Sequence, residues 1–135
     1  MASQREIARI AGVTQASICK WAKSSGISLD DESSRLLFAC IAELSRFSIP
    51  GNEAADIITQ CRNEIRYLTS KDDRVAYVIL FRCGRSKAVQ VQPAISLRAV
   101  EALLESVPAA QVIALHHLVR RAADRLASLD RKEAA

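Results

Sequence analysis

The chain is poor in aromatic residues and in residues that interrupt regular structure. Its 135 residues include one tryptophan, two tyrosines, three phenylalanines, four glycines and three prolines. The shortage of aromatic rings argues against an aromatic-lined sugar or lipid site. Half of the residues are hydrophobic, which is too many for a disordered chain. We therefore expect a mainly α protein whose helices pack through aliphatic side chains.

Long apolar runs and ordered cysteine patterns are also missing. The longest apolar run, residues 75–81, has only the length of a strand, so no membrane span is expected. The cysteines, Cys19, Cys40, Cys61 and Cys83, are far apart and lack metal-ligand spacing, and the polar N-terminus shows no secretory signal. We expect a cytoplasmic protein without a disulfide framework, cofactor or bound metal.

No set of residues with catalytic spacing is evident. We find no nucleophile paired with a base, no paired carboxylates and no glycine-rich phosphate loop. His116 and His117 are adjacent, so on a helix they would point about 100° apart and could not both bind one metal well. The sequence predicts that the protein is not an enzyme and gives no evidence of a small-molecule ligand.

The positive charge is modest overall and uneven along the chain. The formal net charge is +4, and the basic residues are concentrated between positions 62 and 98. Arg82, Arg85 and Lys87 cluster at a predicted turn. This cluster is either a basic wing that makes a secondary DNA contact or simply a solvated turn.

Local signals predict four helices in the first half. Ser3 and Glu6 fit a capping box for a short first helix, Gly12 suits a turn with positive φ, and Thr14 can cap a second helix that runs to about Lys23 and ends near Gly26. Apolar residues over 36–44 predict a third helix, and a break follows at 48–52. Helical spacing then predicts a single helix of four to five turns, with the apolar stripe Ala55, Ile58, Cys61, Ile65 and Leu68.

The second half changes character. Residues 75–81 are β-branched or aromatic, and residues 88–92 alternate between apolar and polar, so the two segments predict a β-hairpin that Pro93 ends. Ser96 can cap a helix carrying Leu97, Val100, Leu103 and Leu104. After Pro108, a final helix is predicted with an apolar seam at every third or fourth position, formed by Val112, Leu115, Val119, Ala122, Leu126 and Leu129.

The apolar seam has two interpretations. It either joins two copies of the chain or packs back on its own chain. We predict a DNA-binding region with supporting helices over residues 1–70, and a hairpin with C-terminal helices forming a dimerisation module over residues 71–135.

The segment from Gln4 to Trp21 resembles the helix-turn-helix of phage and bacterial regulators. The resemblance rests on Ala8 at the helix contact, Gly12 in the turn, and the apolar positions Ile7, Val13, Ile18 and Trp21. The head is similar to those of mercury-resistance-type (MerR-like) regulators and of phage terminase small subunits. The β-wing signature of the first family is missing, and the chain from residue 72 onward resembles neither.

The resemblance implies DNA contacts along the second helix. Gln15, Ser17 and Lys20 are expected to contact bases in the major groove. Gln4, Arg5, Thr14 and Lys23 are expected to contact phosphates, whereas Arg9 either reaches the backbone or is solvated. Trp21 is expected to belong to the core rather than to stack on bases.

We expect a sequence-specific transcriptional regulator, and specifically a repressor, that binds double-stranded DNA as a homodimer on an inverted repeat in a bacterial or phage-infected cell. One alternative is a phage DNA-packaging or recombination-directing factor, in which the second half is an assembly surface. Another is a protein-interaction module that binds no DNA.

Overall fold

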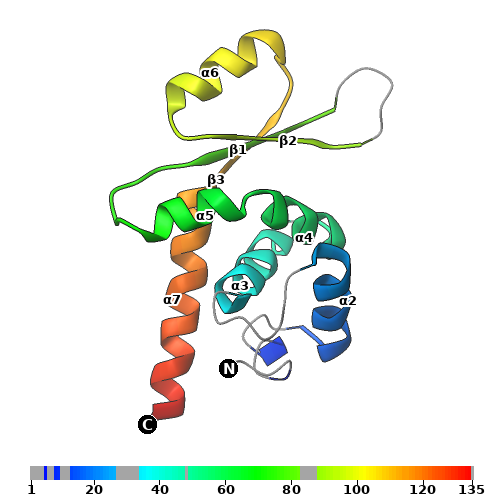
Figure 1. The fold of residues 1–135 in the computed structure, drawn as a ribbon, viewed down its shortest axis with the longest axis vertical. Helices are drawn as coiled ribbons and strands as arrows, with labels where there is room; N and C mark the ends of the chain where they lie inside the picture. The colour runs from blue at the N-terminus through cyan, green and yellow to red at the C-terminus, as the bar shows by residue number, and fades with distance from the viewer. Residues whose placement is uncertain are drawn as a thin grey trace. The chain divides into compact units, whose positions relative to one another are not determined.

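The structure, a computed structural model, describes residues 5, 8–9, 13–26, 34–47, 49–82 and 88–134. The protein is mainly helical, as predicted, with a small antiparallel sheet (Figure 1). The chain forms two compact units. Met1–Gln60 and Leu118–Ala135 make up the first unit, and Cys61–His117 make up the second. This division differs from the predicted one in two ways: the first unit ends at Gln60 instead of residue 70, and Leu118–Ala135 belong to the first unit.

Helix α2 (Gln15–Ser25) begins and ends as its sequence predicts. The Thr14 hydroxyl oxygen accepts a hydrogen bond from the Ser17 backbone N–H at 3.2 Å, which satisfies one of the donors left free at a helix N-terminus. Gly26 ends the helix with φ of 71°, a left-handed conformation that costs glycine little. The boundaries of α2 are therefore determined by local sequence.

Helices α3 (Ser34–Ser45) and α4 (Gly51–Gln60) form the centre of the first unit. Every residue of α3 from Leu37 to Leu44 is buried, as expected of a helix enclosed by others. Helix α4 packs against both α2 and α3. A methyl group placed on Gly51 would lie 2.8 Å from Nε1 of the buried Trp21, so the absence of a side chain at Gly51 allows the indole ring to approach the start of α4.

The single helix predicted after the break at 48–52 is two helices. Helix α4 ends at Gln60 and α5 (Arg62–Thr69) begins after Cys61, whose φ and ψ of −101° and 13° lie outside helical geometry. The prediction of one continuous helix is therefore wrong. The stripe from Ala55 to Leu68 is nevertheless buried on both sides of the break. The apolar periodicity of the sequence continues through Cys61, so the pattern did not reveal the break between α4 and α5.

The second unit contains a sheet with strand order β2-β1-β3. Strands β1 (Tyr77–Phe81) and β2 (Gln90–Ala94) pair antiparallel, with Val78 opposite Pro93, which confirms the predicted pairing. Pro93 does not end the strand, contrary to prediction. It lies inside β2, and because β2 is at the edge of the sheet, the missing N–H is tolerated there.

Helix α6 (Leu97–Ser106) covers one face of the sheet (Figure 1). Its N-terminus is confirmed, since the Ser96 hydroxyl accepts from the Ala99 N–H at 3.1 Å. The core between them is small: Ile79, Ala94 and Val100 are buried, with a few partly buried neighbours around them.

The predicted start of the last helix is wrong. Residues Gln111–Ala114 form β3, which pairs antiparallel with β1, and α7 (Leu115–Ala134) begins only after it. Val112 is therefore a strand residue opposite Ile79. At the junction, the Leu115 N–H donates to the Ala76 carbonyl oxygen at 2.9 Å, and His116 Nδ1 lies 3.0 Å from the same oxygen. These contacts fix the transition from strand to helix.

Among the helices that the structure describes, none combines the length and the apolar character needed to cross a membrane.

Candidate nucleic-acid interface

Helix α2 has one polar, exposed face and one buried face. Gln15, Lys20 and Lys23 are exposed, whereas Ile18 and Trp21 are buried. At about 100° per residue, the solvent-facing positions span roughly half of the helix circumference. Two of the three predicted base-contacting residues, Gln15 and Lys20, therefore lie on a surface that a DNA groove could meet.

Ser17 lies at the margin of this face. It is half-buried, and its hydroxyl is 3.1 Å from the Thr14 hydroxyl, so part of its hydrogen-bonding capacity is used within the cap. Ala16 is exposed beside Gln15, and sequence reasoning passed over it. Its methyl group can contact the methyl group of thymine. Ala16 is the second residue of the helix that Thr14 caps, and this position could have identified it from the sequence.

The described residues just before α2 include Ala8 and Val13, two positions of the predicted helix-turn-helix. Ala8 is helical and only 5% exposed. The Val13 N–H donates to the Ala8 carbonyl oxygen at 3.0 Å, which is the spacing of the outer bond in a Schellman helix ending. Gly12, the predicted turn residue, lies outside the described residues. Trp21 is core, in agreement with its predicted role.

The predicted phosphate contacts are placed in part. Arg5 and Thr14 are exposed and Lys23 is in the last turn of α2. Gln4 lies outside the described residues. Of the predicted secondary contacts, Arg82 is exposed just after β1, and Arg85 and Lys87 also lie outside the described part of the chain.

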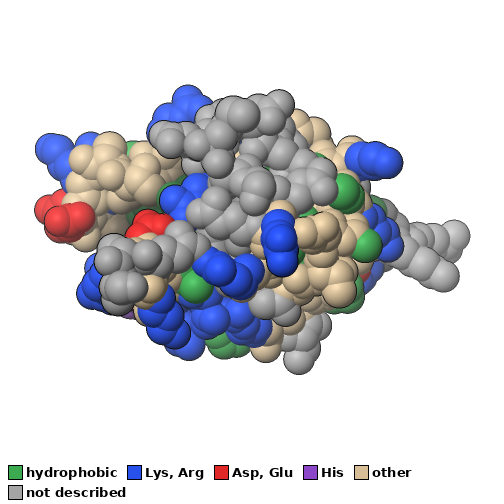
Figure 2. Space-filling view, turned by 90° about the horizontal axis from the view of Figure 1, so that it is seen from below, with side chains coloured by type: hydrophobic (Ala, Val, Ile, Leu, Met, Phe, Trp, Pro, Cys, Tyr) green, Lys and Arg blue, Asp and Glu red, His purple; other side chains and the backbone are tan. Residues whose placement is uncertain are grey.

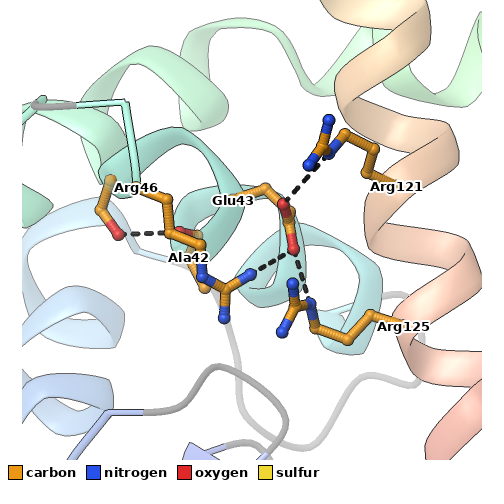
Figure 3. Close-up of polar contacts among 6 residues, drawn as sticks. Ala42, Glu43, Arg46, Arg121 and Arg125 are labelled. Carbon is orange, nitrogen blue, oxygen red and sulfur yellow. Dashed lines mark hydrogen bonds and ion pairs between the residues drawn. The ribbon is translucent and has the colours of Figure 1, made fainter.

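A buried carboxylate gathers three arginines in the first unit. Glu43 of α3 is 1% exposed and accepts from Arg46 and, at 2.6 Å, from Arg125 Nε. Arg121 Nε lies 3.8 Å from its second oxygen. Figure 3 shows the carboxylate between Arg46 of its own helix and the two arginines of α7. One negative charge is thus surrounded by three positive charges, and burial strengthens these interactions.

A groove beside this cluster is strongly basic. Its volume is about 550 Å³. It is lined by Arg9 and by residues of α7, namely Arg121, Asp124, Arg125, Ser128, Leu129 and Lys132. Four of these described lining residues are cationic, and one, Asp124, is a carboxylate. Figure 2, seen from below, shows many Lys and Arg side chains on this face of the molecule, with Asp or Glu side chains at one side. Sequence reasoning missed this site, because Arg9 is more than a hundred positions from α7 in the chain.

The predicted dimer seam is divided by the fold. Leu115, Val119 and Ala122 are buried within the chain, Leu126 and Leu129 are half-buried, and Val112 is exposed in β3. This burial favours the second interpretation of the seam, in which it packs on its own chain. Of these six residues, only Val112 presents an open apolar side chain, at 43% exposure.

The buried cysteines and the histidines have structural surroundings. Burial, reinforced by Glu43 and Glu64 respectively, raises the pKa of Cys40 and of Cys61 to about 12, so both remain thiols at neutral pH. His116 contacts Ala76 and the edge of Tyr77. The part of the chain that the structure describes contains no cluster of three or more His, Cys, Asp or Glu side chains arranged to hold a metal ion.

No protein-family model matches the chain, and comparison with curated proteins gives no match.

Proposed function

We propose that the protein is a sequence-specific DNA-binding transcriptional regulator, and that α2 is the helix that enters the major groove. The solvent-facing polar side of α2 carries this proposal. A helix needs an apolar side to pack in a core, and Ile18 and Trp21 supply it. Gln15 is exposed at the capped N-terminus, where the partial positive charge of the helix dipole also attracts phosphate, and Lys20 is exposed in the middle of the helix.

In the proposed complex, the first turns of α2 contact the edges of the bases. Gln15 can form two hydrogen bonds with adenine, Lys20 can donate to guanine, and the Ala16 methyl can pack on thymine. Thr14 and Lys23 flank these positions and contact phosphates, which fixes the helix in register. Occupation of a promoter by this contact excludes polymerase, so repression is the simplest regulatory outcome.

The proposal includes a homodimer, because one head covers too little DNA for tight specific binding, and two heads usually contact half-sites one helical turn apart. The second unit supports this part. Ile95 and Leu97 are 58% and 64% exposed, and Val112 is exposed on β3, one of the two edge strands. Unpaired strand edges with apolar side chains are suited to association with a second copy.

The DNA contact is tested by selecting preferred sequences from a random duplex pool and measuring affinity by fluorescence anisotropy. Gln15→Ala combined with Lys20→Ala should weaken binding to the selected sequence by about 1–3 kcal/mol for each base that is no longer bound. The matched control is Gln60→Ala with Lys71→Ala, which removes one exposed glutamine and one exposed lysine elsewhere. Unchanged sequence preference in the α2 variant would contradict the proposal and favour an interaction module.

The dimer is tested separately by sedimentation velocity at micromolar concentration. The wild-type protein should sediment as a dimer, and Leu97→Ser with Val112→Ser should shift it toward monomer. Thr69→Ser with Gln92→Ser, at exposed polar positions of the same unit, is the control. A monomeric wild type would reject the dimer, and rings larger than dimers would favour a packaging factor instead.

A further inference from the structure

The groove between Arg9 and α7 has cationic groups that the α2 contact does not use. We propose that it binds the phosphate backbone of duplex DNA and is a second contact surface of the same protomer. This inference rests on the proposed function for the identity of the polyanion. It adds a site on α7 that determines affinity without reading sequence.

The polar side chains of α7 form an extended row. Arg121, Arg125, Ser128 and Lys132 line the groove and follow one another at intervals of four, three and four residues, so they share one side of the helix. The row spans about 16 Å at 1.5 Å per residue. A small anion needs donors that converge on one point, whereas a row of this length matches the successive phosphates of a nucleic-acid strand.

Among the residues that the structure describes, acidic groups do not cancel the charge of the row. Asp130 of α7 is already paired with Arg35 at 3.0 Å, and Glu43 is buried beneath Arg121 and Arg125. Among the described residues, Asp124 is the one carboxylate that lines the groove. The surface of the groove is therefore positive, and a polyanion that covers it would release its own condensed counterions.

Glu43 also positions two of the arginines. Both α7 arginines approach it through Nε, which uses only part of the five N–H donors of each guanidinium group. Phosphate is bound well by such groups, because a guanidinium group donates two parallel hydrogen bonds. A side chain already held at one end loses less conformational freedom on binding. Glu43 is thus a positioning residue for the groove, not a group that contacts DNA.

The test measures the salt dependence of binding to a random-sequence duplex of about two helical turns, with the full chain. Arg121→Gln combined with Lys132→Gln should reduce the slope of log affinity against log salt by about 0.9 for each phosphate that is no longer bound. The ratio of affinities for preferred and random sequence should stay unchanged. The control, Arg62→Gln with Arg98→Gln, removes two exposed arginines of the second unit and should leave the slope near that of the wild type.

The outcomes separate this inference from the proposed function. A slope that is unchanged in the groove variant, or reduced equally in the control, overturns the groove. Loss of sequence preference only in the Gln15 and Lys20 variant, with an unchanged slope in the groove variant, leaves the proposed function standing and the groove rejected. Tighter binding to an RNA duplex of equal length, or no binding to duplex DNA, overturns the assignment to DNA. Thermal unfolding of each variant verifies that it is folded.

Discussion

The two units differ in how completely they bury their apolar residues. In the first unit, every residue of α3 from Leu37 to Leu44 is buried, including the acidic residue Glu43. In the second, the sheet and α6 bury a small core around Ile79, while Ile95 and Leu97 remain exposed. The difference is compatible with the proposed roles, in which the first unit supports α2 and exposed apolar side chains of the second unit contact another copy.

The largest expected effect tests the core of the first unit. Phe38 is 0% exposed, and Phe38→Ala should destabilise the protein by about 3–5 kcal/mol, because it removes buried surface and leaves a cavity. Leu103→Ala, at a half-buried position of α6, should cost less. Urea unfolding of both variants measures the contrast. Equal losses would show that the two cores do not differ in packing.

A smaller effect is expected where α4 meets α2. Gly51→Ala places a methyl group within 2.8–3.1 Å of three atoms of the buried Trp21 ring, and overpacking of this kind costs about 1–3 kcal/mol. Asn52→Ala, at the next and exposed position, is the control and should stay within about 0.5 kcal/mol of the wild type. A neutral Gly51→Ala would mean that the first unit is less tightly packed than proposed.

The third effect extends the comparison to one buried thiol in each unit. The folded state raises the pKa of Cys40 and Cys61 from 9.0 to about 12, so above pH 9 an unfolded chain loses these protons first. Unfolding free energy should therefore be unaffected by these thiols below about pH 8 and should fall between pH 9 and 12, on the order of 1 kcal/mol per pH unit for each thiol.

The measurement for this third effect is urea unfolding across about pH 7–10.5, a range that begins below the ordinary thiol pKa. Cys40→Ala and Cys61→Ala should each flatten the alkaline decline relative to the wild type. If only Cys40→Ala flattens the decline, the protected environment belongs to the first unit alone.

Several elements could be predicted because their signals are local. The caps at Thr14 and Ser96 and the ending at Gly26 each involve backbone groups within four residues, so the sequence beside them contains the necessary information. The exposed face of α2 could be predicted too, because it follows from the helical spacing of polar and apolar residues within that segment. The site on α7 could not be predicted in this way, since it depends on Arg9 and Glu43, which are distant in the chain from Arg125.

The break at Cys61 and the strand at Val112 show that local sequence also could not predict every element of the fold. Sequence alone determined that the protein is mainly helical, that α2 starts at a threonine cap, and that residues near 77–81 form a strand. Only tertiary structure decided that Cys61 interrupts a regular apolar stripe and that Val112 belongs to a strand. The apolar positions from Val112 to Ala122 fit a helix equally well, and the backbone of β1, more than thirty residues earlier, selects the strand by pairing with it.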